Sequence, residues 1–147
     1  MSDKTADDKL NTLLADYMVF YQKLRNYHWN VKGSEFFKLH EKFEEAYNEA
    51  ADFADDIAER ILARGSRPAS TMAEFINTAT LDEDRSVPTA EEMVANLVSD
   101  IETLNGRTSS LIPEIEETGD RATANLLDDI IDAQDERLWM FRTFLAE

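Results

Sequence analysis

The 147-residue chain contains no cysteine, which excludes disulfide bridges, thiolate-bound zinc and cysteine nucleophiles. It also lacks any run close to the roughly 20 apolar residues that a membrane span requires. The first eight residues contain no hydrophobic signal region, so export is not supported. These absences predict a soluble, cytoplasmic protein that does not associate with a membrane.

Positive charge is scarce as well. The formal net charge is −16, and capture of nucleic acid requires clustered lysine and arginine. The N-terminal segment offers only Lys4 and Lys9, diluted by Asp3, Asp7 and Asp8, so direct DNA binding is not expected. Two explanations of the acidity stay open: a surface adapted to high salt, or a field that draws cations to the protein.

No segment reads as a strand, and apolar residues recur at helical spacing through most of the chain. Thr71-x-x-Glu74 and Thr89-x-x-Glu92 have the form of capping boxes that open helices. Pro113 is expected to kink or locally distort the helix that contains it. The pattern predicts long helices over about 5–30, 37–63, 89–117 and 120–145, with a short helix over 72–77.

Four long helices with a short extra helix in a long middle connection predict an all-α four-helix bundle. The long connection favours a crossover between the second and third long helices, which is the ferritin-like arrangement. No linker, repeat or low-complexity segment divides the chain. We therefore predict one domain over residues 1–147.

The most informative pattern is His40-x3-Glu44-x10-Asp55-x3-Glu59. At about 100° per residue, these four side chains share one face of a single helix. At 1.5 Å per residue, however, His40 and Glu59 lie roughly 28 Å apart along the axis. One helix cannot close both ends around one small ligand.

Two copies packed antiparallel about a two-fold axis could bring His40 and Glu44 of one chain against Asp55 and Glu59 of the other. Histidine with several carboxylates suits iron or a similar divalent cation. Each half also has an ordinary interpretation, since histidine–glutamate pairs and acidic faces are common on solvated helices. On spacing alone, a shared metal site and a solvated face are both open.

Several motifs resemble one known family. Residues 26–33 (NYHWNVKG), 36–44 (FFKLHEKFE), 55–65 (DDIAERILARG) and 138–145 (LWMFRTFL) are similar to the signature of the Dps mini-ferritins (DNA-binding proteins from starved cells). The resemblance spans essentially the whole chain. It implies four-helix subunits assembled into a hollow shell of twelve, with a ferroxidase centre at the two-fold dimer interface.

The resemblance implies that His28, His40 and Glu44 come from one subunit, and Asp55 and Glu59 from its two-fold mate. His28 enters only through this resemblance; as a lone histidine near a helix end it has an equally simple structural interpretation. The position of Glu44 is commonly aspartate in the family. Glutamate is one methylene longer, which bears on metal spacing and occupancy.

The implied reaction is oxidation of Fe(II), preferentially by hydrogen peroxide, followed by storage of ferric mineral in the shell, which protects against oxidative damage. Trp29 and Trp139 could intercept stray oxidising equivalents, or be core or interface aromatics. Family members admit iron through acidic pores around the start of the last helix. Asp120 and Asp128 are the predicted pore residues.

Two rivals remain. A ferritin or bacterioferritin with an intra-subunit diiron site uses Glu-x-x-His pairs, and neither His28 nor His40 follows a glutamate by three residues. A helical bundle with an inert site, serving assembly only, is the other.

Overall fold

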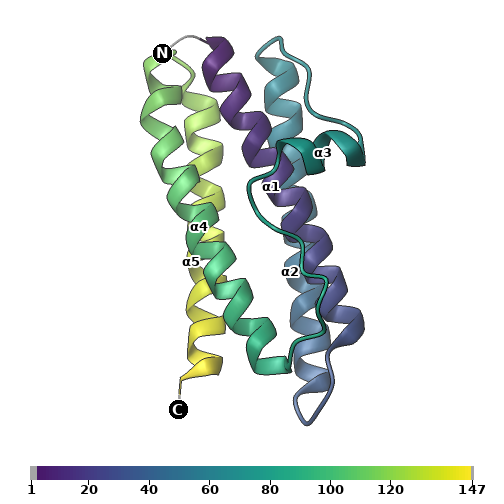
Figure 1. Cartoon of the computed structure of the whole chain (residues 1–147). Coiled ribbons are helices and arrows are strands. Elements are labelled where there is room, and N and C mark those ends of the chain that lie inside the picture. Colours follow the sequence, from purple (N-terminus) through teal and green to yellow (C-terminus); the bar gives the residue numbers. More distant parts are fainter. Residues whose placement is uncertain (1–2, 147) are drawn as a thin grey trace.

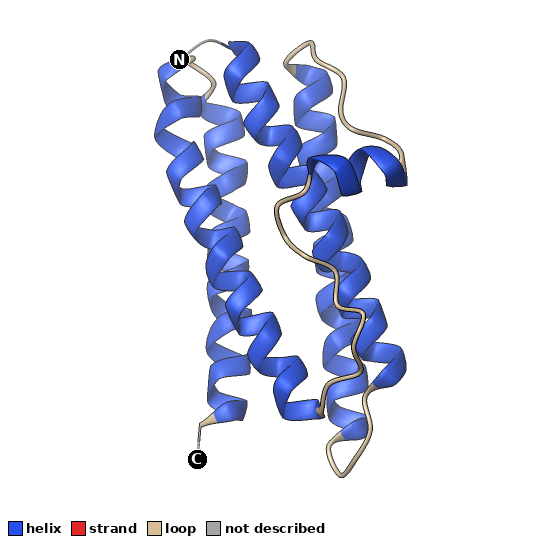
Figure 2. Ribbon diagram, in the orientation of Figure 1, coloured by secondary structure: helices blue, strands red, loops and turns tan. Residues whose placement is uncertain are grey.

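The computed structural model describes residues 3–146, and within that range the chain forms five helices and no strand. Figures 1 and 2 show four long helices side by side and one short helix outside them. The all-α four-helix bundle with a short extra helix is confirmed, with bounds within two residues of those predicted. The helices are α1 (Asp3–Asn30), α2 (Phe36–Ala63), α3 (Met72–Thr78), α4 (Ala90–Glu117) and α5 (Arg121–Leu145).

Local chemistry explains where the helices begin and end. The Thr71 and Thr89 hydroxyls accept hydrogen bonds from the main-chain N–H three residues later, as N-cap side chains do. Helix α2 ends in a Schellman motif: Gly65 has φ of 90°, its N–H donates to the Leu62 carbonyl, and the Ser66 N–H donates to the Ile61 carbonyl. Helix α4 continues through Pro113 to Glu117.

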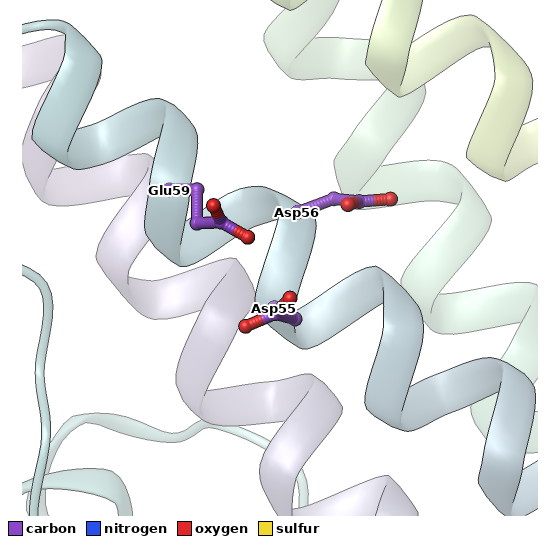
Figure 3. A group of neighbouring side chains, drawn as sticks. All are labelled: Asp55, Asp56 and Glu59. Carbon is purple, nitrogen blue, oxygen red and sulfur yellow. The ribbon is translucent and has the colours of Figure 1, made fainter.

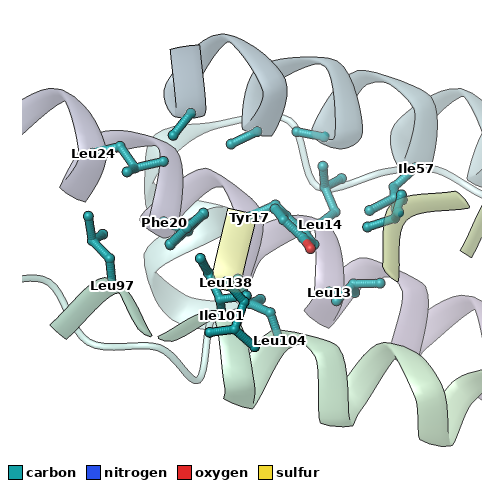
Figure 4. Close-up of a cluster of buried hydrophobic side chains, with 14 of the residues drawn as sticks. Leu13, Leu14, Tyr17, Phe20, Leu24, Ile57, Leu97, Ile101, Leu104 and Leu138 are labelled. Atoms are coloured by element: carbon teal, nitrogen blue, oxygen red, sulfur yellow. The ribbon is translucent and has the colours of Figure 1, made fainter. Parts of the chain in front are cut away.

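The core lies between two helix pairs. Helix α1 packs along α2, and α4 packs along α5. Side chains from all four meet in the middle, where Tyr17, Phe20 and Leu104 are among the fully buried residues (Figure 4). The exposed side of α2 carries polar side chains that include Glu44, Asp55 and Glu59.

The crossover between α2 and α4 runs most of the length of the bundle, so these two helices point the same way (Figure 1). Asp16 in α1 holds the crossover in place, and its side chain is completely buried. Its carboxylate accepts hydrogen bonds from the Thr80 and Leu81 N–H groups, from the Thr80 hydroxyl and from Arg107. A buried charge with four donors is fully compensated.

Candidate metal centre

The two histidines of the chain lie against each other where α1 ends and α2 begins. Nδ1 of His28 is 2.6 Å from the His40 carbonyl oxygen, and Nδ1 of His40 is 2.7 Å from the His28 carbonyl oxygen. A carbonyl only accepts, so both Nδ1 atoms must carry the proton and donate. In the neutral ring this tautomer leaves Nε2 with a free lone pair, which is the form that binds a metal.

Aromatic contacts hold these rings in place. The His28 and His40 rings are stacked, with centroids 3.7 Å apart and planes 13° from parallel. Phe36 stacks on His40 at 5.0 Å, and Tyr47 meets the His28 ring edge-on at 5.3 Å. The two imidazoles therefore belong to a packed aromatic group, with His28 itself buried.

Glu44 completes this group on the solvent side. Its Oε1 lies 3.7 Å from Nε2 of His28, while more than half of its side chain stays exposed. The stacked imidazoles from α1 and α2 and the Glu44 carboxylate beside His28 thus lie at the same end of the bundle. A set of this kind suits Fe(II) or a similar divalent cation.

The second group lies farther along α2. Asp55, Asp56 and Glu59 are exposed, and one carboxylate oxygen from each lies within 4.8 Å of the others. Figure 3 shows the three side chains on neighbouring turns of α2. The hydrogen bond with Asp55 and the charge of Asp55 raise the pKa of Glu59. A cation between the two carboxylates would relieve that repulsion.

Within one chain these two groups do not meet. Asp55 lies eleven positions after Glu44 on α2, a distance of about 16 Å along the axis. The structure therefore brings His28 against His40 and Glu44 near His28. Separately, it brings together Asp55, Asp56 and Glu59. Metal binding by the five residues stays a prediction.

Three residues of these groups were not identified from the sequence. Phe36 precedes His40 by one helical turn, so helical spacing could have revealed it. Asp56 adjoins Asp55. In the sequence it is one of several acidic residues on this helix, so nothing marks it as a member of the group. Tyr47 could not be found this way, because its contact with His28 depends on how α1 packs against α2.

The two tryptophans are not part of the core. Trp29 is 57% exposed and Trp139 is 64% exposed. The Arg25 guanidinium lies over the Trp29 ring at 4.9 Å, a cation–π contact. Interface and oxidation roles for these residues stay predictions.

The two predicted pore residues differ in their surroundings. Asp120 is the N-cap of α5, accepts hydrogen bonds from the Thr123 N–H and hydroxyl, and pairs with Arg64 at 2.9 Å. This gives Asp120 a structural role at the start of the helix. Asp128 is exposed on α5, and its pore role stays a prediction.

Comparison with known proteins identifies the family that this chain matches. Residues 7–147 match the family model described as a ferritin-like domain. A "DNA protection during starvation protein 2" from Bacillus anthracis is 40% identical over 145 residues, which cover 99% of both chains.

Solved structures agree with the sequence comparison. The crystal structure of Dps from Staphylococcus aureus superimposes with a TM-score of 0.96 at 35% identity, covering 99% of this chain and 98% of that one. A Dps protein from Vibrio cholerae O1, described as a member of a broad superfamily of ferritin-like diiron-carboxylate proteins, gives a TM-score of 0.94 at 35% identity. The match covers 97% of this chain and 90% of the Vibrio chain.

Proposed function

Because this chain belongs to the Dps family of ferritin-like proteins, we propose that it is a ferroxidase and iron-storage protein that limits oxidative damage. In this proposal, residues 1–147 form one ferritin-like domain. The relative from Vibrio cholerae is described as a diiron-carboxylate protein, and the donor set of this chain has the same chemical character. Iron is the substrate and the stored cargo.

The observation that carries the proposal is the presence of two incomplete ligand groups, one where α1 meets α2 and one farther along α2. One chain would bind iron through His28, His40 and Glu44. A two-fold-related partner would bind it from the other side through Asp55 and Glu59. Both Nδ1 protons are hydrogen-bonded to main-chain carbonyls, so the Nε2 atoms of the neutral imidazoles are available to bind the metal. Imidazole nitrogens and carboxylate oxygens are ligands that suit ferrous iron.

Hydrogen peroxide is the proposed preferred oxidant. Two Fe(II) ions give one electron each to peroxide, the O–O bond breaks, and two protons complete two water molecules. Because both electrons are delivered together, no hydroxyl radical is released. The ferric product passes to a mineral core inside a hollow shell of twelve chains.

Stopped-flow oxidation of Fe(II) tests this activity. The wild-type protein should react much faster with peroxide than with dioxygen, and His40→Ala should lose most of the rate. Lys38→Ala is a matched control, since Lys38 is exposed on the same helix and carries no proposed ligand. Equal rates for wild type and His40→Ala would remove this site from consideration.

The proposed assembly and partners have separate tests. Light scattering should give a particle of about twelve chains, the closed symmetric shell proposed here; a monomer at micromolar concentration would contradict it.

In residues 3–146, no helix is both long and apolar enough to cross a bilayer. We place the protein in the cytoplasm. Direct DNA binding is not expected at a net charge of −16, so a tight gel-shift complex at physiological salt would overturn that expectation.

A further inference from the structure

A hydrogen bond at one nitrogen does not fix the orientation of the His28 ring. The bond from Nδ1 to the His40 carbonyl lets the ring turn about the N–H···O direction, and the torsion that turns an imidazole has only broad preferences. Such a turn would carry Nε2 away from Glu44, whose Oε1 lies 3.7 Å from it. The plane of the ring must therefore be fixed by what packs against it.

The two imidazoles differ in their packing. His40 stacks with two rings, Phe36 at 5.0 Å and His28 at 3.7 Å. Within residues 3–146, His28 stacks with His40 alone, and its other ring contact is with Tyr47, edge-on at 5.3 Å with 80° between the planes. Tyr47 thus supplies to His28 the second ring contact that Phe36 supplies to the other imidazole.

Helix geometry explains why Tyr47 reaches His28. Helical side chains lean toward the N-terminus of their own helix, and α1 and α2 run in opposite directions (Figure 1). Tyr47 follows His40 by seven residues, about 10.5 Å along the axis. His28 leans along the bundle toward Tyr47, and Tyr47 leans back toward His28, so the two side chains close that gap.

Tyr47 has a second aromatic contact, with α1. Tyr21, seven residues before His28, meets Tyr47 edge-on, with centroids 5.8 Å apart and planes at 87°. The Arg25 guanidinium lies over the Tyr21 ring at 5.3 Å. Both tyrosines are partly buried and pack against the core. A continuous line of ring contacts therefore leads from Tyr21 through Tyr47 to His28.

We propose that Tyr47 is a positioning residue of the metal centre: its ring fixes the plane of His28, so that Nε2 stays directed toward the side where Glu44 lies. Tyr21 holds Tyr47 in turn. The proposal rests on the proposed function and adds two residues that donate no ligand atom. Side chains that orient a metal ligand typically change metal affinity by about 10–100-fold when they are replaced.

Titration of the metal-free protein with Co(II), in the absence of an oxidant, tests the role of the ring. Tyr47→Leu keeps an apolar side chain with good helix propensity but removes the ring, so Co(II) should bind about tenfold more weakly. Tyr47→Phe keeps the ring and should bind Co(II) within twofold of wild type. Wild-type binding by Tyr47→Leu, or equally weak binding by both variants, would overturn the proposal.

Phe53→Leu is the control for a general loss of packing. Phe53 is a partly buried aromatic residue of the same helix that meets Tyr17 edge-on at 5.7 Å, about 20 Å beyond His40 along the axis. Its replacement should lower the thermal midpoint about as much as Tyr47→Leu and leave Co(II) binding within twofold of wild type. Equal weakening of Co(II) binding by the two variants would reduce the effect of Tyr47 to one on stability and overturn the proposal.

A crystal structure of metal-free Tyr47→Leu gives a readout that needs no metal. The His28 ring should leave its stacked position, now 13° from parallel with His40, or occupy two orientations. His40 should keep its stacking with Phe36. An unchanged His28 ring would overturn the proposal even if Co(II) binding fell.

The positioning and the activity can fail independently. Weaker Co(II) binding and a displaced His28 ring in Tyr47→Leu, when the wild type oxidises no iron, would remove the proposed function and leave the positioning. Iron oxidation lost in His40→Ala, with Tyr47→Leu binding Co(II) as wild type does, would keep the function and overturn the positioning.

Discussion

His28 and His40 each donate from Nδ1 to the main-chain carbonyl of the other, at 2.6 and 2.7 Å. Each ring therefore has two separate tasks. Its Nδ1 side ties the end of α1 to the start of α2, and its Nε2 side is left for a ligand. Substitutions that keep one side and remove the other can separate structure from chemistry.

We predict that His40→Asn keeps the hydrogen bond to the His28 carbonyl, because the asparagine amide nitrogen occupies nearly the place of Nδ1. It should lose the ligand position of Nε2. His40→Ala loses both. Removing one such hydrogen bond costs about 1 kcal/mol, which lowers a thermal midpoint by about 2–4 °C in a chain of this size. Thermal unfolding should thus separate Ala from Asn, while stopped-flow iron oxidation should be lost in both. Full activity in His40→Asn would show that Nε2 of His40 is not a ligand.

Helix positions could be predicted from the sequence because they follow from local signals. The capping threonines Thr71 and Thr89 and the apolar repeat of each long helix act within one or two turns. The common face of His40, Glu44, Asp55 and Glu59 follows from helix geometry alone. Each of these needs only knowledge of residues nearby in the chain.

Contacts between distant segments could not be predicted in this way. Asp16 looks like an exposed polar residue of an amphipathic helix, yet it is buried under a loop that begins 64 residues later. The Tyr47–His28 contact depends on how two helices are rotated about their axes. The centre as a whole is harder still, because the proposed ligand set is divided between two chains.

Asp16→Ala, in α1, should loosen the crossover more than any other single change. It removes the acceptor for Arg107 and for the Thr80 and Leu81 N–H groups at once. Leaving buried donors without an acceptor costs about 1–3 kcal/mol. Chemical unfolding should report that loss, and hydrogen exchange should show faster exchange at Thr80 and Leu81. Asp8→Ala, at an exposed position of the same helix, is the control and should change stability by less than about 0.5 kcal/mol.

Glu74 provides a prediction about pH. Its hydrogen bonds with Arg67 and Thr71 lower its pKa to about 2. A carboxyl whose pKa is lower in the folded state contributes stability above its ordinary pKa, and that contribution is lost as pH falls toward the folded value. Protection of the start of α3 from exchange should therefore begin to fall as the pH drops below about 4.5 and reach its lowest level near pH 2. Arg67→Gln should move this transition upward; an unchanged transition would show that Arg67 does not set it.

Mixing two inactive variants tests whether the centre is shared. His40→Ala damages the histidine group and Glu59→Ala the acidic group, so each alone should be inactive. When equal amounts are dissociated and reassembled together, half of the dimers contain one chain of each kind. Such a dimer places both defects in one of its two centres and leaves the other intact. About a quarter of all centres, and of the wild-type rate of iron oxidation, should then return.

A mixture of His28→Ala with His40→Ala is the control. Both residues lie in the same group, so every mixed centre keeps one defect and no iron oxidation should return. If the mixture with Glu59→Ala also stays inactive although light scattering shows mixed particles, the histidines and the acidic pair do not meet across the two-fold axis.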